Sequence, residues 1–154
     1  MDAETRSALS RLLRKERIAH LATLRGGAPM ASMTLFLADE TFTAFYVHVS
    51  RLAWHTQDML HEPRVALSIA EADDGRADPF TLMRVTIRGE AIQLTDGPKA
   101  AWLQRFPEQA INFQLADFSF WKITPRDARF VAGFGRIHNL SAAQLGEAAN
   151  NHHP

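Results

Sequence analysis

Residues 42–59 read Phe42-Thr43-Ala44-Phe45-Tyr46-Val47-His48-Val49-Ser50-Arg51-Leu52-Ala53-Trp54-His55-Thr56-Gln57-Asp58-Met59, an apolar strand that runs directly into a short helix. A helix start leaves backbone N–H groups unpaired and carries the positive end of the helix dipole, so it attracts anions. Ser50 and Thr56 can add hydroxyl donors there, while Arg51 and His55 can add charge or an imidazole N–H. The stretch predicts a phosphate site, and the same spacing also fits Ser50 as a simple N-cap with Arg51 in solvent.

Alternating segments on both sides of this stretch predict a mostly β fold. Before it, strands at 18–24 and 29–37 would form an antiparallel meander with the strand at 42–49. After it, the expected strands are 65–69, 81–94, 118–123 and 129–134, with the last two separated by Thr124-Pro125-Arg126-Asp127. The prediction is a closed or partly open β-barrel of six or seven mostly antiparallel strands, since closure removes exposed strand edges.

Helices are expected only at the periphery of this barrel. Asp2 can cap a first helix that has a leucine-rich face. Gly97-Pro98 begins another helix, and Pro107 separates it from a further helical piece. The tail at 141–154 has no strong pattern, which predicts a short helix that frays into disorder.

Composition narrows the class of protein. With 154 residues, the chain is long enough for one domain with a full core, placed at residues 1–140. Lys plus Arg and Asp plus Glu both total 17, so no long-range field favours nucleic acid or an anionic membrane as a partner. The chain has no cysteine and no apolar run of about 18 residues, so we expect a cytoplasmic protein.

Four ordered blocks carry a resemblance to a known family. They are residues 50–59, Met83-Arg84-Val85-Thr86-Ile87-Arg88-Gly89-Glu90-Ala91, Asp117-Phe118-Ser119-Phe120-Trp121-Lys122-Ile123 and Gly133-Phe134-Gly135-Arg136. Together they resemble the FMN-binding split-barrel superfamily of pyridoxamine 5'-phosphate oxidase, and most closely its haem-utilisation branch. The resemblance implies a mostly antiparallel split β-barrel with peripheral helices. It also implies FMN as the cofactor, and a homodimer with the flavin sites in the seam.

The resemblance places the FMN phosphate against the turn already described, namely Ser50, Arg51, His55 and Thr56. His55 stands where the oxidase pattern has a lysine, so the affinity for phosphate would depend mainly on Arg51. The strand expected beneath the flavin ring contributes Met30, Ser32, Met33 and Thr34.

Other residues are expected at the flavin from farther along the chain. Arg84 matches the position from which the second subunit reaches the cofactor. Phe118 and Trp121 resemble an aromatic block that covers the cofactor or lines the seam, although aromatic residues at such spacing are often plain core. Arg136, after a tight Gly133-to-Gly135 turn, is a candidate ligand for the flavin phosphate or for a substrate.

Neither a metal site nor a hydrolytic site is predicted. His48, His55 and His61 lack the spacing of a His-Glu-x-x-His motif, and no Ser-His-Asp grouping or Walker loop is present. Redox chemistry would therefore belong to a bound cofactor.

Three functions follow as expectations. The first is an FMN-dependent oxidoreductase of the pyridoxamine 5'-phosphate oxidase type, acting on an unidentified small molecule. The second is a flavin carrier without turnover. The third is a haem-binding or haem-degrading protein, in which His138, His152 or His153 of the final segment could reach the iron.

Overall fold

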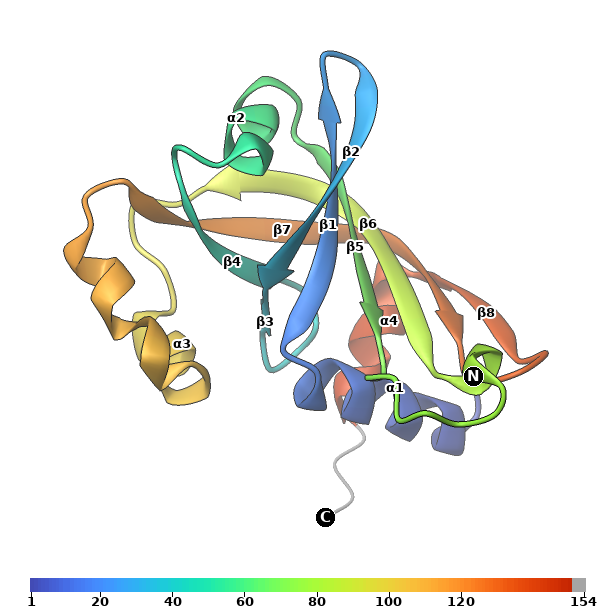
Figure 1. The fold of residues 1–154 in the computed structure, drawn as a ribbon. Helices are drawn as coiled ribbons and strands as arrows, with labels where there is room; N and C mark the ends of the chain where they lie inside the picture. The colour runs from blue at the N-terminus through green and yellow to red at the C-terminus, as the bar shows by residue number, and fades with distance from the viewer. Residues whose placement is uncertain (151–154) are drawn as a thin grey trace.

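The structure, a computed structural model, describes residues 1–150. These residues form one eight-stranded sheet that curls into a half-barrel, with helices at its periphery (Figure 1). Every strand pair is antiparallel, in the order β2-β1-β5-β6-β7-β4-β3, with β8 paired to β7. The strands are β1 Ile18–Arg25, β2 Ala28–Leu35, β3 Leu37–Ala38, β4 Phe45–Ser50, β5 Arg64–Ala70, β6 Arg84–Gln93, β7 Phe118–Val131 and β8 Ile137–Ser141. The predicted fold class, a mostly antiparallel β-barrel with peripheral helices, is confirmed.

The two edges of the sheet are consecutive in the chain. Strands β2 and β3 lie at opposite ends of the strand order, yet only Phe36 separates them in the sequence. Because a single residue joins them, the backbone itself brings the two edges of the half-barrel together. This residue, Phe36, is fully buried.

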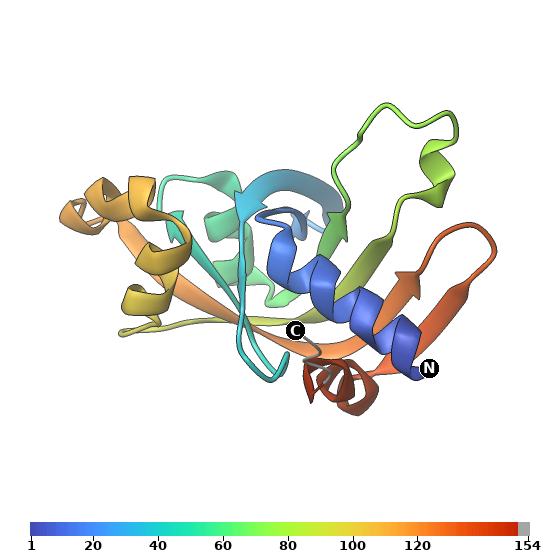
Figure 2. The ribbon, with the colours of Figure 1, turned by 90° about the horizontal axis from the view of Figure 1, so that it is seen from below.

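The helices lie at the periphery of the barrel. They are α1 Ala3–Lys15, α2 Trp54–His61, α3 Lys99–Arg105 and α4 Ala142–Glu147, with 3-10 turns at Pro79–Thr81, Pro107–Gln114 and Ala148–Asn150. Helix α1 runs across one end of the barrel (Figure 2), and α2 lies at the other end beside the β1–β2 hairpin (Figure 1). The predicted cap is confirmed, because the Asp2 carboxylate accepts a 2.8 Å hydrogen bond from the Thr5 N–H.

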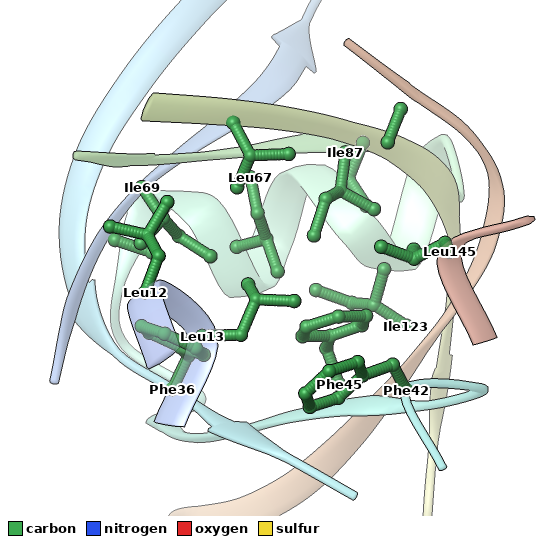
Figure 3. Close-up of a cluster of buried hydrophobic side chains, with 14 of the residues drawn as sticks. Leu12, Leu13, Phe36, Phe42, Phe45, Leu67, Ile69, Ile87, Ile123 and Leu145 are labelled. Carbon is green, nitrogen blue, oxygen red and sulfur yellow. The ribbon is translucent and has the colours of Figure 1, made fainter. Parts of the chain in front are cut away.

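The core lies inside the curled sheet. Leu12 and Leu13 of α1 meet Phe45, Leu67 and Ile123 from three different strands (Figure 3). In β4, burial alternates with the period of a strand, so Val47 and Val49 also face inward while His48 and Ser50 face outward. This alternation puts the polar end of β4 on the outside of the barrel, next to α2.

The expected meander is wrong. Strand β4 pairs with β7 along its whole length, from Phe45 opposite Ile123 to Ser50 opposite Phe118. Its contact with the preceding strand is limited to the two residues of β3. Between β3 and β4 the chain reverses through Phe42, whose φ of 54° lies in the left-handed region, and this turn directs β4 away from β2.

The expected break at residues 124–127 is also wrong, because β7 is one continuous strand of 14 residues. Arg88 pairs with Asp127 and Gly89 pairs with Pro125, so Arg126 is the extra residue of a β-bulge. A bulge tolerates proline inside a strand, and this explains why the same residues resemble a turn in the sequence.

The sequence analysis did not include β8, which pairs with the end of β7 after a turn at Gly133 and Gly135. The short helix expected after Ser141 is present as α4, and its Leu145 is fully buried in the core. The fraying predicted for the last residues falls at 151–154, outside the described residues. Within residues 1–150, no helix combines the length and apolar character needed to cross a bilayer.

The bulge yields a test of the fold. Replacing Gly89 with Ala would place a Cβ against the backbone carbonyl of Thr124 across the β6–β7 pair. Because backbone atoms cannot move aside as a side chain can, we expect Gly89→Ala to lower the free energy of unfolding by about 1–3 kcal/mol. The exposed neighbour Glu90→Ala should stay within about 0.5 kcal/mol of wild type. Urea denaturation measures both, and equal stability of the two variants would contradict the bulge.

Candidate functional site

The outward end of β4 and the turn into α2 form a well-defined polar site. The Ser50 carbonyl accepts a 3.1 Å hydrogen bond from the Ala53 N–H, and the Ser50 hydroxyl accepts one of 3.1 Å from the Leu52 N–H. The chain is therefore folded back on itself between the strand and the helix.

Asp117 fixes this turn from the other side. Its carboxylate accepts a 2.5 Å hydrogen bond from the Ser50 hydroxyl, and its backbone carbonyl accepts a 2.7 Å bond from the Arg51 N–H. Asp117 immediately precedes β7, and the pairing of Ser50 with Phe118 places it there. The Ser50 hydroxyl thus donates its proton and accepts one hydrogen bond within the protein.

The simple N-cap alternative for Ser50 is wrong. Helix α2 begins at Trp54, and its N-cap is Ala53, which makes no side-chain capping bond. Ser50 lies three residues earlier and supports the turn, not the helix end.

A buried carboxylate anchors α2 to the barrel. Asp58 is 4% exposed and accepts hydrogen bonds from the Thr23 hydroxyl at 2.8 Å and from the Arg25 guanidinium at 2.7 Å. The same guanidinium lies over the Trp54 ring, 4.0 Å from its centroid. The charge of Asp58 is therefore matched inside the site, and the position of the first turn of α2 is fixed.

Two predicted phosphate ligands have unexpected environments. Burial lowers the pKa of the His55 imidazole below its usual value, and the nearby Asp58 carboxylate offsets this only in part. At neutral pH the ring is therefore uncharged. Thr56 is 1% exposed, and its hydroxyl is buried without a hydrogen-bond partner among the described residues. Arg51 is exposed and is the remaining cation of the turn.

An aromatic box lies beside this turn. His48, two residues before Ser50 on the same face of β4, stacks on Phe113 with 4.2 Å between ring centroids and also packs against Phe118 and Phe120. Burial lowers the pKa of His48. A small hollow of about 190 Å³ opens between these rings and Lys99. Phe118 therefore lies next to the Ser50 turn of its own chain.

The other residues expected around a flavin differ in how far they are buried and in which face of the sheet they lie on. Thr34 is buried and donates to the Leu35 carbonyl at 3.1 Å, while Met33 is 63% exposed on the outer side of β2. Met30 and Ser32 are half-buried on the same strand, which packs beside α2. Trp121 lies in the hydrophobic core, 2% exposed.

Arg84 and Arg136 lie far from the Ser50 turn within one chain. Arg84 pairs with Val131 at the end of β7, whereas Ser50 pairs with Phe118 at its beginning. The Arg84 guanidinium donates to the backbone carbonyls of the 80–82 turn, and Arg136 donates to the Thr5 hydroxyl at 3.0 Å.

Two larger hollows lie elsewhere, on the sheet. One, of about 630 Å³, is lined by residues of β6, β7 and β8, and the other, of about 450 Å³, surrounds the bulge. Arg88 and Arg126 border both. Residues 1–150 hold no cluster of His, Asp or Glu side chains arranged to bind a metal ion.

Sequence reasoning assigned no role to Asp117, Asp58 or Arg25. Asp117 contacts Ser50 across 67 residues of sequence, and Arg25 reaches Asp58 across 33. The signals available in the sequence were an acidic residue before a strand, Asp117, and an acidic residue on the buried face of a helix, Asp58.

Comparison with known proteins gives a consistent result. A family model described as pyridoxamine 5'-phosphate oxidase matches residues 5–132. The chain is 34% identical over 111 residues to the chloroplastic heme oxygenase HOZ of Arabidopsis thaliana, covering 70% of this chain and 33% of the relative. It is 25% identical over 142 residues to heme oxygenase HutZ of Vibrio cholerae, covering 86% of this chain and 79% of the relative.

Among solved structures, a heme binding protein from Mycobacterium smegmatis superposes with a TM-score of 0.80 at 26% identity, over 93% of this chain and 60% of that one. The chain spans about a third of the length of the Arabidopsis relative. The family match covers most of the described residues. The chain belongs to the pyridoxamine 5'-phosphate oxidase family.

Proposed function

We propose that this chain binds haem at the Ser50 turn and the first turn of α2. The observation that carries the proposal is His55, a half-buried imidazole that burial keeps uncharged at neutral pH. A neutral imidazole has a free lone pair and is a common axial ligand of haem iron. A protonated ring could not coordinate iron.

The surroundings of His55 suit a flat apolar ring system. Leu52 is 73% exposed and Trp54 is 56% exposed, so this short segment presents apolar surface to solvent. Isolated apolar residues are common on protein surfaces. Here, however, two exposed apolar side chains lie beside an uncharged imidazole and an exposed arginine, and this combination suits haem as a ligand. Arg51 supplies the cation that pairs with a propionate carboxylate.

The similar proteins support the same ligand. The two curated relatives are named heme oxygenases, and the Mycobacterium smegmatis neighbour is named a heme binding protein. Haem, when bound, would supply iron-centred redox chemistry. The part of this chain would be to hold the macrocycle through His55, to orient it through Arg51 and to exclude water with Leu52 and Trp54.

We propose further that the site is shared between two copies of the chain. Arg84 and Arg136 lie at the opposite end of β7 from Ser50, so they can approach a ligand at this turn only from a partner. The outer face of β1, β5 and β6 fits a self-complementary interface, because small residues such as Ala22, Ala66 and Ser68 leave it flat.

FMN remains a second candidate, because the matching family is named for an oxidase and the turn carries Arg51 at a helix start. The protein would then be an oxidoreductase acting on a small molecule, or a flavin carrier. If FMN is the ligand, Arg51→Ala should weaken its binding about ten- to hundredfold, because a charge-assisted contact is lost. Fluorescence titration of FMN measures this, and equal affinities would remove Arg51 from the site.

Haem binding is tested by titrating haemin into the wild-type protein, His55→Ala and His61→Ala. His61 is a matched control on the same helix, since it is exposed and its ring is bonded to the Gln57 carbonyl at 2.8 Å. We expect a Soret band with wild type and with His61→Ala, and at least about tenfold weaker binding with His55→Ala. Absence of a Soret band with wild type would refute haem binding. An unchanged His55→Ala titration would refute His55 as the ligand.

The shared site is tested by sedimentation. A stable interface of this kind buries about 2,000 Å² or more in total, so the wild type should sediment as a dimer at micromolar concentration. Ala22→Glu places an unpaired charge on the outer sheet face and should shift the protein to monomer. Ala100→Glu, on the exposed side of α3, should leave the dimer intact. A wild-type monomer would contradict the proposal.

A further inference from the structure

We propose that Asp117 excludes phosphate groups from the Ser50–Thr56 turn and so selects against FMN. The inference goes beyond haem binding, because it concerns a ligand that the turn rejects and names the residue responsible. It stands on the contacts of Ser50 and on the charges gathered around the turn.

The Ser50 hydroxyl has one proton to donate, and that proton is directed at the Asp117 carboxylate over 2.5 Å. A phosphate oxygen that binds this hydroxyl must first displace the carboxylate. Displacement is opposed by the backbone, because the Asp117 carbonyl accepts the Arg51 N–H at 2.7 Å and the next residue pairs with Ser50 in the sheet. Asp117 is therefore held where the phosphate would lie.

The charges point the same way. A phosphate monoester carries about 1.5 to 2 negative charges at neutral pH, and like charges at contact distance disfavour each other. The lowered pKa of His55 leaves that ring neutral, and the Arg25 guanidinium is paired with Asp58. Within residues 50–56, Arg51 is then the remaining charged cation, and Asp117 offsets it, so the turn itself offers a phosphate no net positive charge.

The remaining donor of the predicted phosphate site is not available either. The Thr56 hydroxyl belongs to a side chain that is 1% exposed, so a ligand in solvent cannot reach it without opening α2. Of the four residues expected to hold phosphate, Arg51 presents an accessible cation and His55 offers at most one uncharged N–H. Removing the Asp117 carboxylate would release the Ser50 hydroxyl as a further donor and remove a negative charge together.

The test compares FMN with riboflavin, which has the same ring system without the phosphate. Flavin fluorescence titrations are run on the wild type, Asp117→Asn and Glu147→Gln. Glu147→Gln is the matched control, because Glu147 is an exposed carboxylate of α4, at the end of the barrel that α1 covers. We expect wild type and Glu147→Gln to bind FMN within about threefold of riboflavin, and Asp117→Asn to prefer FMN by at least about tenfold.

A double variant shows whether the gain passes through Ser50. In Asp117→Asn combined with Ser50→Ala, the FMN preference should fall back by at least about threefold, because the Ser50 hydroxyl, which a neutral amide oxygen holds less tightly than a carboxylate, is then gone. Thermal unfolding of each variant confirms that it is folded. A wild type that already prefers FMN tenfold would overturn the proposal. So would an Asp117→Asn protein with no FMN preference or no measurable flavin binding. Haemin titration is a separate readout, so failure of haem binding and failure of phosphate exclusion are distinguishable.

Discussion

Strand β7 is the element on which the rest of the structure depends. It pairs with β6 along most of its length, with β4 at its beginning and with β8 at its end. These pairings position residues at both ends of the strand: Asp117 lies against Ser50 at its beginning, and Arg84 lies opposite Val131 at its end. The bulge at Arg126 bends β7, so that one strand can form both sets of pairs.

Local patterns in the sequence were sufficient for much of the fold. The apolar run before Ser50 indicated β4, the alternating apolar residues of 65–69 indicated β5, and Asp2 marked the start of α1 correctly. The pattern failed where a residue type has two structural uses. Pro125 with Asp127 resembles a turn, but the structure uses it inside a bulge, and the length of β7 was missed for that reason.

The structure brings the four residues of the predicted phosphate turn together and adds contacts that the sequence does not show. Ser50, Arg51, His55 and Thr56 do lie together where β4 meets α2. What the sequence does not reveal is how each is occupied, since the contact of Ser50 with Asp117 and of Asp58 with Arg25 arises only from strand pairing and helix packing. Burial then decides the protonation of His55, and burial is a property of the assembled barrel. Which ligand these hydroxyl, imidazole and guanidinium groups can bind therefore depends on contacts with residues that are distant in the sequence.

The wide separation of β4 and β7 in the sequence also has a consequence during synthesis. Strand β4 emerges from the ribosome long before β7, its partner along the whole of Phe45 to Ser50. Until then, one full edge of β4 and its apolar face of Phe45, Val47 and Val49 have no sheet to join. Nascent chains of this kind are open to pairing with one another, so a stall in translation before residue 118 leaves this apolar edge exposed to aggregation.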